Sequence, residues 1–151
     1  MLCVIQPGAA TIFSQDGSVI EGAHLIETMN NMSNISDNPF PIHFFYNTHC
    51  GSCKRAVRYL QNFTLDHPDT TVEYHDLYNN TESFVLFENY KQEFHRQDIS
   101  YPVIFVGNTG IMDSLDIELY TEILTLWYQN HTPSDLITGF ISRITSSMQY
   151  Q

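Results

Sequence analysis

The residues of this sequence that are best suited to chemistry are two cysteines three positions apart, Cys50 and Cys53. They follow an apolar run at 42–46 and precede a segment with helical spacing, so we expect them at the start of a helix. The first helical turn brings such a pair to one side, where the two sulfurs can bond to each other. Unpaired amide groups and the helix dipole favour a thiolate at Cys50. A thiol with a lowered pKa is the nucleophile that disulfide exchange requires.

Three of the six basic residues of the chain, Lys54, Arg55 and Arg58, lie within five positions of Cys53. In a chain with a formal net charge of −11, this cluster would add to the stabilisation of a thiolate. The alternative is a solvated helix face whose basic side chains pair with Asp or Glu. Both interpretations stay open from the sequence.

The elements that must position the cysteines follow from hydrophobic periodicity. Short apolar or alternating runs predict strands, and apolar residues three and four apart predict helices. The predicted strands cover 42–46, 71–75, 101–106 and 111–113, with a turn at 107–110. The predicted helices cover 53–63, 81–96, 117–127 and 133–149. A strand–helix–strand order implies parallel pairing and the closing hairpin adds an antiparallel edge, so the sequence predicts an α/β fold.

Two apolar stripes on the predicted helices are assigned to packing rather than to binding. The first comprises Ile117, Tyr120, Ile123, Leu124 and Trp127, and the second comprises Ile137, Phe140, Ile141, Ile144 and Met148. The last predicted helix, which carries the second stripe, begins with Thr132 as its N-cap and Pro133 at its first helical position. Its one basic residue, Arg143, argues against docking on an anionic membrane.

The sequence before Pro39 predicts an N-terminal extension over 1–38, followed by one domain over 39–151. Asp16-Gly17 between apolar residues predicts a β-hairpin over 10–22, and 23–32 is typical of a short helix. A polar connector over 30–41 leads into the domain. The first ten residues resemble the end of a secretory signal without its basic start. We expect Cys3, in that stretch, to be a free thiol or to be lost on processing.

Composition excludes several classes of function. The chain has 151 residues, with 17 acidic and six basic side chains and a sequence pI near 4.7, so phosphate groups repel it. Nucleic acid and anionic membrane surfaces are therefore not expected partners. No apolar run approaches the ~20 residues that span a bilayer. Three cysteines are too few for a disulfide-rich secreted scaffold.

Glycosylation sequons and the signal-like start favour an exported location over a cytoplasmic one. Five Asn-x-Ser/Thr sequons begin at Asn31, Asn34, Asn62, Asn79 and Asn130. An exported location favours an oxidant or an isomerase, and a cytoplasmic one favours a reductant. We expect a monomer whose partners are a disulfide- or dithiol-containing protein substrate and a redox partner.

The stretch FFYNTHCGSC at 44–53, together with Tyr101-Pro102-Val103 at the start of a later strand, resembles the thioredoxin superfamily, glutaredoxins included. The resemblance implies a thioredoxin fold with a central mixed four-stranded sheet flanked by helices. The extension and the last helix would be additions to this fold. The resemblance further implies that Cys50 is the exposed nucleophile, that Cys53 is the buried resolving thiol, and that a cis Pro102 faces them.

The resemblance also implies which residues border the substrate. The backbone of Tyr101, next to Pro102, would pair with the substrate chain. We also count His49, Gly51 and Ser52 as substrate-binding residues, with His49 as a polar residue at the rim of the site. Gly51 and Ser52 occupy positions that tune the redox poise in this family. The pair matches none of the usual signatures, so reductant, oxidant and isomerase remain alternatives. No cofactor is expected.

The sequence departs from the family pattern at three places. Thioredoxins carry Trp before the first cysteine and a buried Asp on the preceding strand, where this chain has His49 and Phe44. Residues 110–116 lack the Gly-Gly motif through which glutaredoxins recognise glutathione, so glutathione binding is not expected.

The competing interpretation is a thioredoxin-like binding module that holds a metal or an iron–sulfur cluster through Cys50 and Cys53, with His49 as a further ligand. A structural zinc site usually takes four ligands. The sequence offers no second close pair of cysteines, and its other histidines, His43, His75 and His95 among them, are scattered. We therefore expect no metal site. A third interpretation is a redox-inactive scaffold in which the two cysteines form a permanent staple.

Overall fold

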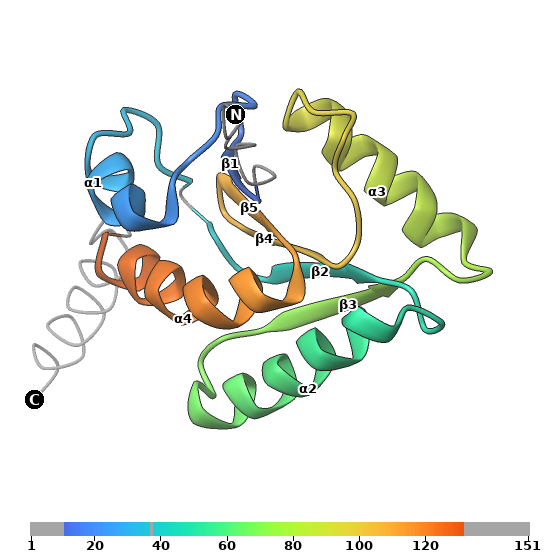
Figure 1. Ribbon diagram of the computed structural model, residues 1–151. Coiled ribbons are helices and arrows are strands. Elements are labelled where there is room, and N and C mark those ends of the chain that lie inside the picture. Colours follow the sequence, from blue (N-terminus) through green and yellow to red (C-terminus); the bar gives the residue numbers. More distant parts are fainter. Residues whose placement is uncertain (1–10, 37, 132–151) are drawn as a thin grey trace, which may run out of the picture.

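A five-stranded mixed sheet forms the centre of the protein in a computed structural model that describes residues 11–36 and 38–131 (Figure 1). The strands are β1 (Ile12–Ser14), β2 (Ile42–Tyr46), β3 (Val72–Asp76), β4 (Val103–Val106) and β5 (Thr109–Met112). The helices are α1 (Leu25–Asn30), α2 (Gly51–Asp66), α3 (Thr81–Glu93) and α4 (Ser114–His131), and a 3₁₀ turn, η1 (Gly22–His24), precedes α1. The predicted α/β class is thereby confirmed.

The order of strands across the sheet is β1-β5-β4-β2-β3. β2 and β3 are parallel because α2 connects them as a crossover, and every other neighbouring pair is antiparallel. β4 and β5 form the predicted closing hairpin, and Gly107 in its turn has a φ of +54° that favours glycine. β3 and β1 are the two edge strands.

Helices cover both faces of the sheet and create two apolar clusters. Side chains of α1, α2 and α4 pack with Phe44, Ile104 and other strand residues on one face. Phe87 of α3, with Phe94 and Ile99 after it, packs with Phe13, Phe45, Phe105 and other strand residues on the opposite face. The alternation along β2 therefore assigns Phe44 and Phe45 to opposite layers, as expected for a strand buried on both sides.

The N-terminal extension contributes more to the sheet than the sequence predicted. A central sheet of four strands was expected, and the structure has five because β1 pairs antiparallel with β5. The predicted hairpin over 10–22 is reduced to one isolated bridge between Phe13 and Val19. Phe13 lies opposite Gly110 of β5, where a Cβ atom would collide with the phenyl ring. The absence of a side chain at Gly110 therefore leaves room for the Phe13 ring and allows β1 to pair with β5.

Several predicted elements differ from the observed ones at their ends. α2 begins at Gly51 and continues to Asp66, and the strand expected at 101–106 begins at Val103. In the predicted stripe of α4, Ile117, Leu124 and Trp127 are buried, whereas Ile123 is 43% exposed and does not belong to the core. The predicted last helix and the signal-like first ten residues lie outside the described residues. Within the described ranges, no helix has the length and apolar character needed to cross a membrane.

Candidate functional site

The two cysteines lie where the sequence predicted, at the start of the helix that follows β2. Cys50 is the N-cap of α2, with an extended backbone, and its Sγ accepts a hydrogen bond from the backbone N–H of Cys53 at 3.2 Å. The backbone N–H of Cys50 donates to the carbonyl oxygen of Asn47 at 2.9 Å. The first sulfur therefore caps a helix end whose unpaired amides and dipole favour negative charge.

The two sulfurs lie at disulfide-bonding distance, with their Cα atoms 5.3 Å apart. Their environments differ, because Cys53 is 1% exposed whereas Cys50 lies at the surface and is partly exposed. Ser52 is exposed and its Oγ lies 3.2 Å from the Sγ of Cys50. Gly51 is also exposed, with open space where a Cβ would be. A molecule that approaches from solvent therefore meets Cys50 before Cys53.

An aspartate on the neighbouring strand holds the loop that leads to Cys50. The carboxylate of Asp76, the last residue of β3, accepts hydrogen bonds from the backbone N–H of Thr48 at 3.1 Å, from the Thr48 hydroxyl, and from the backbone N–H of Tyr78 at 3.0 Å. Burial of the carboxyl opposes ionisation, but these hydrogen bonds outweigh it, so the pKa of Asp76 lies below its ordinary value. Sequence analysis missed this residue, whose one signal is an acid at the end of a predicted strand.

His49 lies at the rim of the site. Its backbone N–H donates to the Asn47 side chain at 2.9 Å, and its ring packs edge-on against Tyr78 with centroids 4.2 Å apart. The side chain is exposed. Among the described residues, the group of side chains whose ligand atoms lie close enough together to hold a metal does not include His49, Cys50 or Cys53.

The sequence left two roles open for the basic residues after Cys53, which are stabilising a thiolate or pairing with acids on a solvated helix face. The structure gives different answers for different members of this cluster. Arg55 donates to the Glu118 carboxylate on α4 at 2.6 Å, which is the predicted pairing of a solvated helix face. Lys54 and Arg58 are exposed and form no ion pair with any described residue. Both line a hollow of about 480 Å³ that Cys53 also borders. Positive charge is thus available beside the cysteines from these two side chains.

Tyr101 and Pro102 lie at the same end of the sheet as the cysteines. The Tyr101–Pro102 peptide bond is cis, as the resemblance implies, and Pro102 is buried. Val103 lies opposite Phe45 in the antiparallel pairing of β4 with β2, so the start of β4 adjoins the end of β2. Tyr101 lines a second hollow, of about 350 Å³, and Asn47 borders both hollows. The loop before Cys50 therefore connects two concave surfaces.

Two histidines that the sequence analysis described as scattered lie side by side, which corrects that statement for His43 and His75. His43 Nδ1 and His75 Nε2 are 3.0 Å apart, and Glu73 joins them as a third group with metal-ligand chemistry. Burial lowers the pKa of His43 most, against the raising effect of the Glu73 and Glu93 carboxylates. Burial also lowers the pKa of His75, and the proximity of His43 adds to this effect.

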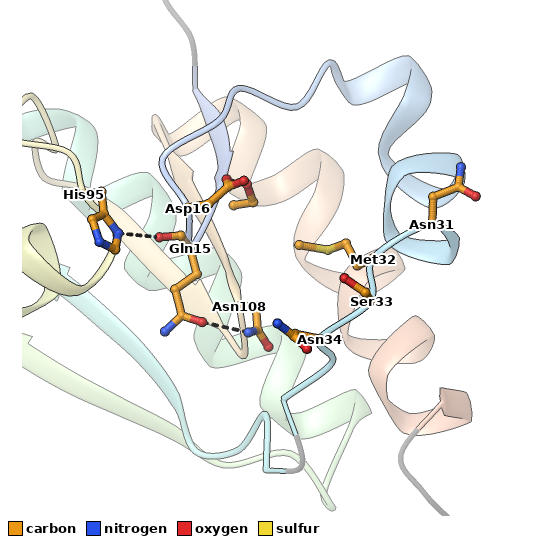
Figure 2. A pocket seen from close by; sticks show the side chains of 9 residues that line it. Gln15, Asp16, Asn31, Met32, Ser33, Asn34, His95 and Asn108 are labelled. Atoms are coloured by element: carbon orange, nitrogen blue, oxygen red, sulfur yellow. Dashed lines mark hydrogen bonds between the residues drawn. The ribbon is translucent and has the colours of Figure 1, made fainter.

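A hollow of about 400 Å³ lies away from the cysteines, on the side of the N-terminal extension (Figure 2). Gln15 connects the extension to two later segments that line this hollow. The backbone carbonyl of Gln15 contacts His95 Nδ1 at 3.1 Å, and the side-chain oxygen of Gln15 accepts a hydrogen bond from Asn108 at 2.8 Å. Its other lining residues, Met32 and Asn34 among them, belong to the extension. Neither the cysteines nor the predicted rim residues line it, so His95 stands apart from both groups described above.

Comparison of the chain with models of protein families, with curated proteins and with solved structures gives no match. Of the residues predicted from the sequence, the structure brings Cys50, Cys53, His49, Gly51 and Ser52 together at one helix end, with Tyr101 and Pro102 on the adjoining strand end.

Proposed function

We propose that this protein is a thiol–disulfide oxidoreductase in which Cys50 attacks a substrate disulfide and Cys53 resolves the resulting mixed disulfide. The observation that carries the proposal is the asymmetry of the pair. A partly exposed sulfur caps the amino end of α2 and accepts the Cys53 N–H, while its partner at bonding distance is buried. An exposed, stabilised thiolate beside a sheltered thiol is the arrangement that two-step disulfide exchange needs.

The topology supports a thioredoxin-like fold for the domain. Without β1, four strands remain in the order β5-β4-β2-β3 and form a mixed sheet, which is the kind of sheet that the resemblance implies. α2 connects the parallel strands and starts at the CxxC pair. β1 is then an addition at the β5 edge, and the cis Tyr101–Pro102 bond just before β4 supports the same interpretation.

The exchange proceeds in two balanced steps. The Cys50 thiolate attacks one sulfur of the substrate disulfide, the substrate S–S bond breaks, and the leaving substrate thiolate takes up a proton. The Cys53 thiol then loses its proton and attacks the Cys50 sulfur, which releases the second substrate thiol. Two electrons pass to the substrate and the Cys50–Cys53 dithiol becomes a disulfide; an oxidant runs the same steps in reverse.

Hydrogen bonds, the helix end and nearby positive charge stabilise the Cys50 thiolate in this mechanism. The backbone N–H of Cys53 and the hydroxyl of Ser52 donate hydrogen bonds to the sulfur. The amino end of the helix adds its dipole, and Lys54 and Arg58 add exposed positive charge nearby. Each of these stabilises the thiolate more than the thiol.

The substrate that suits the site is an extended segment of a protein chain. Asn47 borders both hollows; Cys53 lines one of them, and the other carries the exposed rings of Phe84 and Tyr101. An extended segment across this surface would place its backbone against Tyr101 and its sulfur against Cys50. A disulfide-containing protein and a second redox protein are the partners that this chemistry requires.

Trapping the intermediate tests the proposal. Cys53→Ser in the reduced protein should accumulate a mixed disulfide between Cys50 and a peptide disulfide, visible as a mass increase that dithiothreitol reverses. Cys50→Ser is the matched control, because it keeps a hydroxyl cap on α2 and removes the nucleophile. If both variants trap the peptide equally, or neither does, Cys50 is not the attacking thiol. For the unsubstituted protein, a reduction potential of about −270 mV would indicate a reductant and one of about −120 mV an oxidant.

A further inference from the structure

A second cluster with metal-ligand chemistry lies on the face of the sheet that α3 covers. β2 and β3 are parallel with His43 opposite Glu73 and Phe45 opposite His75. Side chains two apart on a strand share a face, so His43, Glu73 and His75 all project to the side of Phe45. The pairing of the strands, rather than sequence proximity, brings the three groups together.

The separations between the three donor atoms match those around a tetrahedral metal. His43 Nδ1 lies 3.0 Å from His75 Nε2 and 3.5 Å from Glu73 Oε2, and His75 Nε2 lies 3.8 Å from the same oxygen. Zinc bonds of about 2.0–2.2 Å at tetrahedral angles place neighbouring donors about 3.3–3.6 Å apart. The observed triangle brackets this range, so small side-chain movements would equalise its edges around one ion.

The two imidazole rings are held in place by aromatic neighbours. His75 stacks on Phe45 with centroids 4.7 Å apart, and the His43 ring lies 5.5 Å from that of Tyr90 on α3. The two imidazoles stack on each other at 5.3 Å with 15° between their planes. Rings fixed in this way lose little further freedom when they bind an ion.

The cluster is also open to solvent on one side. The side chains of His43 and His75 are 23% and 15% exposed, and that of Glu73 is 52% exposed. An ion can therefore enter beside Glu73, and a water molecule can take a fourth coordination position. Three protein ligands and one open position form an accepted zinc geometry.

We propose that His43, Glu73 and His75 form a binding site for a divalent transition-metal ion of the zinc class. Two imidazole nitrogens and one carboxylate oxygen suit Zn²⁺ better than Mg²⁺ or Ca²⁺, which prefer oxygen ligands. On binding, the proton that His43 Nδ1 and His75 Nε2 share moves to the other nitrogen of its ring, so both rings stay neutral. The bound ion would connect His43 of β2 with Glu73 and His75 of β3, and would thereby stabilise the edge strand β3.

The site is independent of the cysteines, which separates it from the metal site that the sequence left as an alternative. It needs no thiolate, so it should bind zinc while Cys50 and Cys53 remain disulfide-bonded. We expect the chelator-treated, oxidised full-length protein to bind one Zn²⁺ per chain in competition with a chromogenic chelator. Co²⁺ in its place should give visible d–d bands without sulfur-to-metal charge-transfer absorption.

Substitutions at the three ligands provide the decisive comparison. Glu73→Gln, at an exposed position, should weaken Zn²⁺ binding about 10-fold or more, and His75→Gln should weaken it about 100-fold or more. His24→Gln is the matched control, because exposed His24 also has carboxylates of Glu21 and Glu27 beside it but, within the described ranges, belongs to no group of three metal-ligand side chains. This variant should bind Zn²⁺ as the unsubstituted protein does.

Zinc-dependent stability gives a second readout, and its first part uses the unsubstituted protein alone. Zn²⁺ should raise the thermal midpoint of the oxidised, unsubstituted protein and should raise that of Glu73→Gln much less. Binding that appears only after reduction, with sulfur-to-cobalt charge transfer, would overturn the proposal and favour the cysteines as ligands. Unchanged affinity in both Glu73→Gln and His75→Gln would overturn it as well.

Discussion

The two groups of reactive side chains in this protein both depend on β2, but they are assembled in different ways. The cysteines follow the end of β2 and are brought together by one helical turn, three residues apart. His43 and His75 are 32 residues apart and meet only because β2 and β3 pair in one register. A site built by local spacing should survive local disturbance of the sheet, whereas a site built by strand register should not.

The largest expected effect comes from removing the aromatic side chain that supports the histidine cluster. Phe45 is fully buried, stacks on His75 and packs against Phe87 and Phe105. Phe45→Ala should lower the free energy of unfolding by about 3–5 kcal/mol, because it removes a buried ring and leaves a cavity. Urea denaturation of the oxidised protein measures this loss.

The same variant separates the two sites. Phe45→Ala should weaken Zn²⁺ binding under native conditions while it leaves the alkylation rate of reduced Cys50 nearly unchanged. Leu65→Ala is the control for stability, since Leu65 is 79% exposed near the end of α2 and its removal should cost less than about 0.5 kcal/mol. Equal losses of stability in the two variants would contradict this account of the β2 core.

A smaller effect should appear in the dependence of stability on pH. Burial lowers the pKa of His43 and His75 below the ordinary value of about 6.5. As the pH falls, these two histidines therefore bind protons more readily in the unfolded chain than in the native protein. The stabilisation is complete above pH 6.5 and is lost as the pH falls from there through the lowered pKa values. Each histidine contributes at most about 1.4 kcal/mol per pH unit, and solvent contact reduces this slope.

Urea denaturation at several pH values below 6.5, in the presence of a chelator, tests this dependence. The variant with both His43→Gln and His75→Gln should show a flatter loss of stability than the unsubstituted protein. His24→Gln, at an exposed histidine, should keep the original slope. A double variant with the original slope would show that other groups cause the dependence.

The smallest expected effect concerns the hydroxyl beside the proposed nucleophile. Ser52 Oγ lies 3.2 Å from Cys50 Sγ, and a hydrogen bond from it stabilises the thiolate by about 0.5–1.5 kcal/mol. Ser52→Ala should therefore raise the pKa of the Cys50 thiol by up to about one unit. The pH profile of alkylation measures the midpoint; Ser52→Thr, which keeps the hydroxyl, should restore it, and an unchanged midpoint in Ser52→Ala would exclude the contact.

The same contrast between local and long-range structure explains how much the sequence could predict. The α/β class, the strand before the cysteines and the helix after them follow from periodicities and from residues close in sequence. The positions of Cys50 and Cys53 at a helix start were predicted for this reason. The sequence-based expectation of one buried and one exposed thiol came from a family resemblance, and the burial of Cys53 agrees with it.

The features that the sequence did not predict depend on contacts between distant segments. β1 joins the sheet by pairing with β5, almost a hundred residues later in the chain. Nothing in the sequence around Gly110 indicates that the ring of Phe13 packs against it. Asp76 reaches the loop before Cys50 only because β3 lies beside β2. Register of this kind is not encoded in any short window, so the histidine cluster was missed as well.

Selective alkylation of the reduced protein tests the central claim most directly. Limited iodoacetamide treatment near pH 7, followed by mass spectrometry of peptides, reports the rate at each cysteine. Cys50 should react at least about 10-fold faster than Cys53, because its sulfur is partly exposed and its thiolate is stabilised by the helix end. Slow and equal labelling of both cysteines would contradict the account and would favour a permanent structural disulfide.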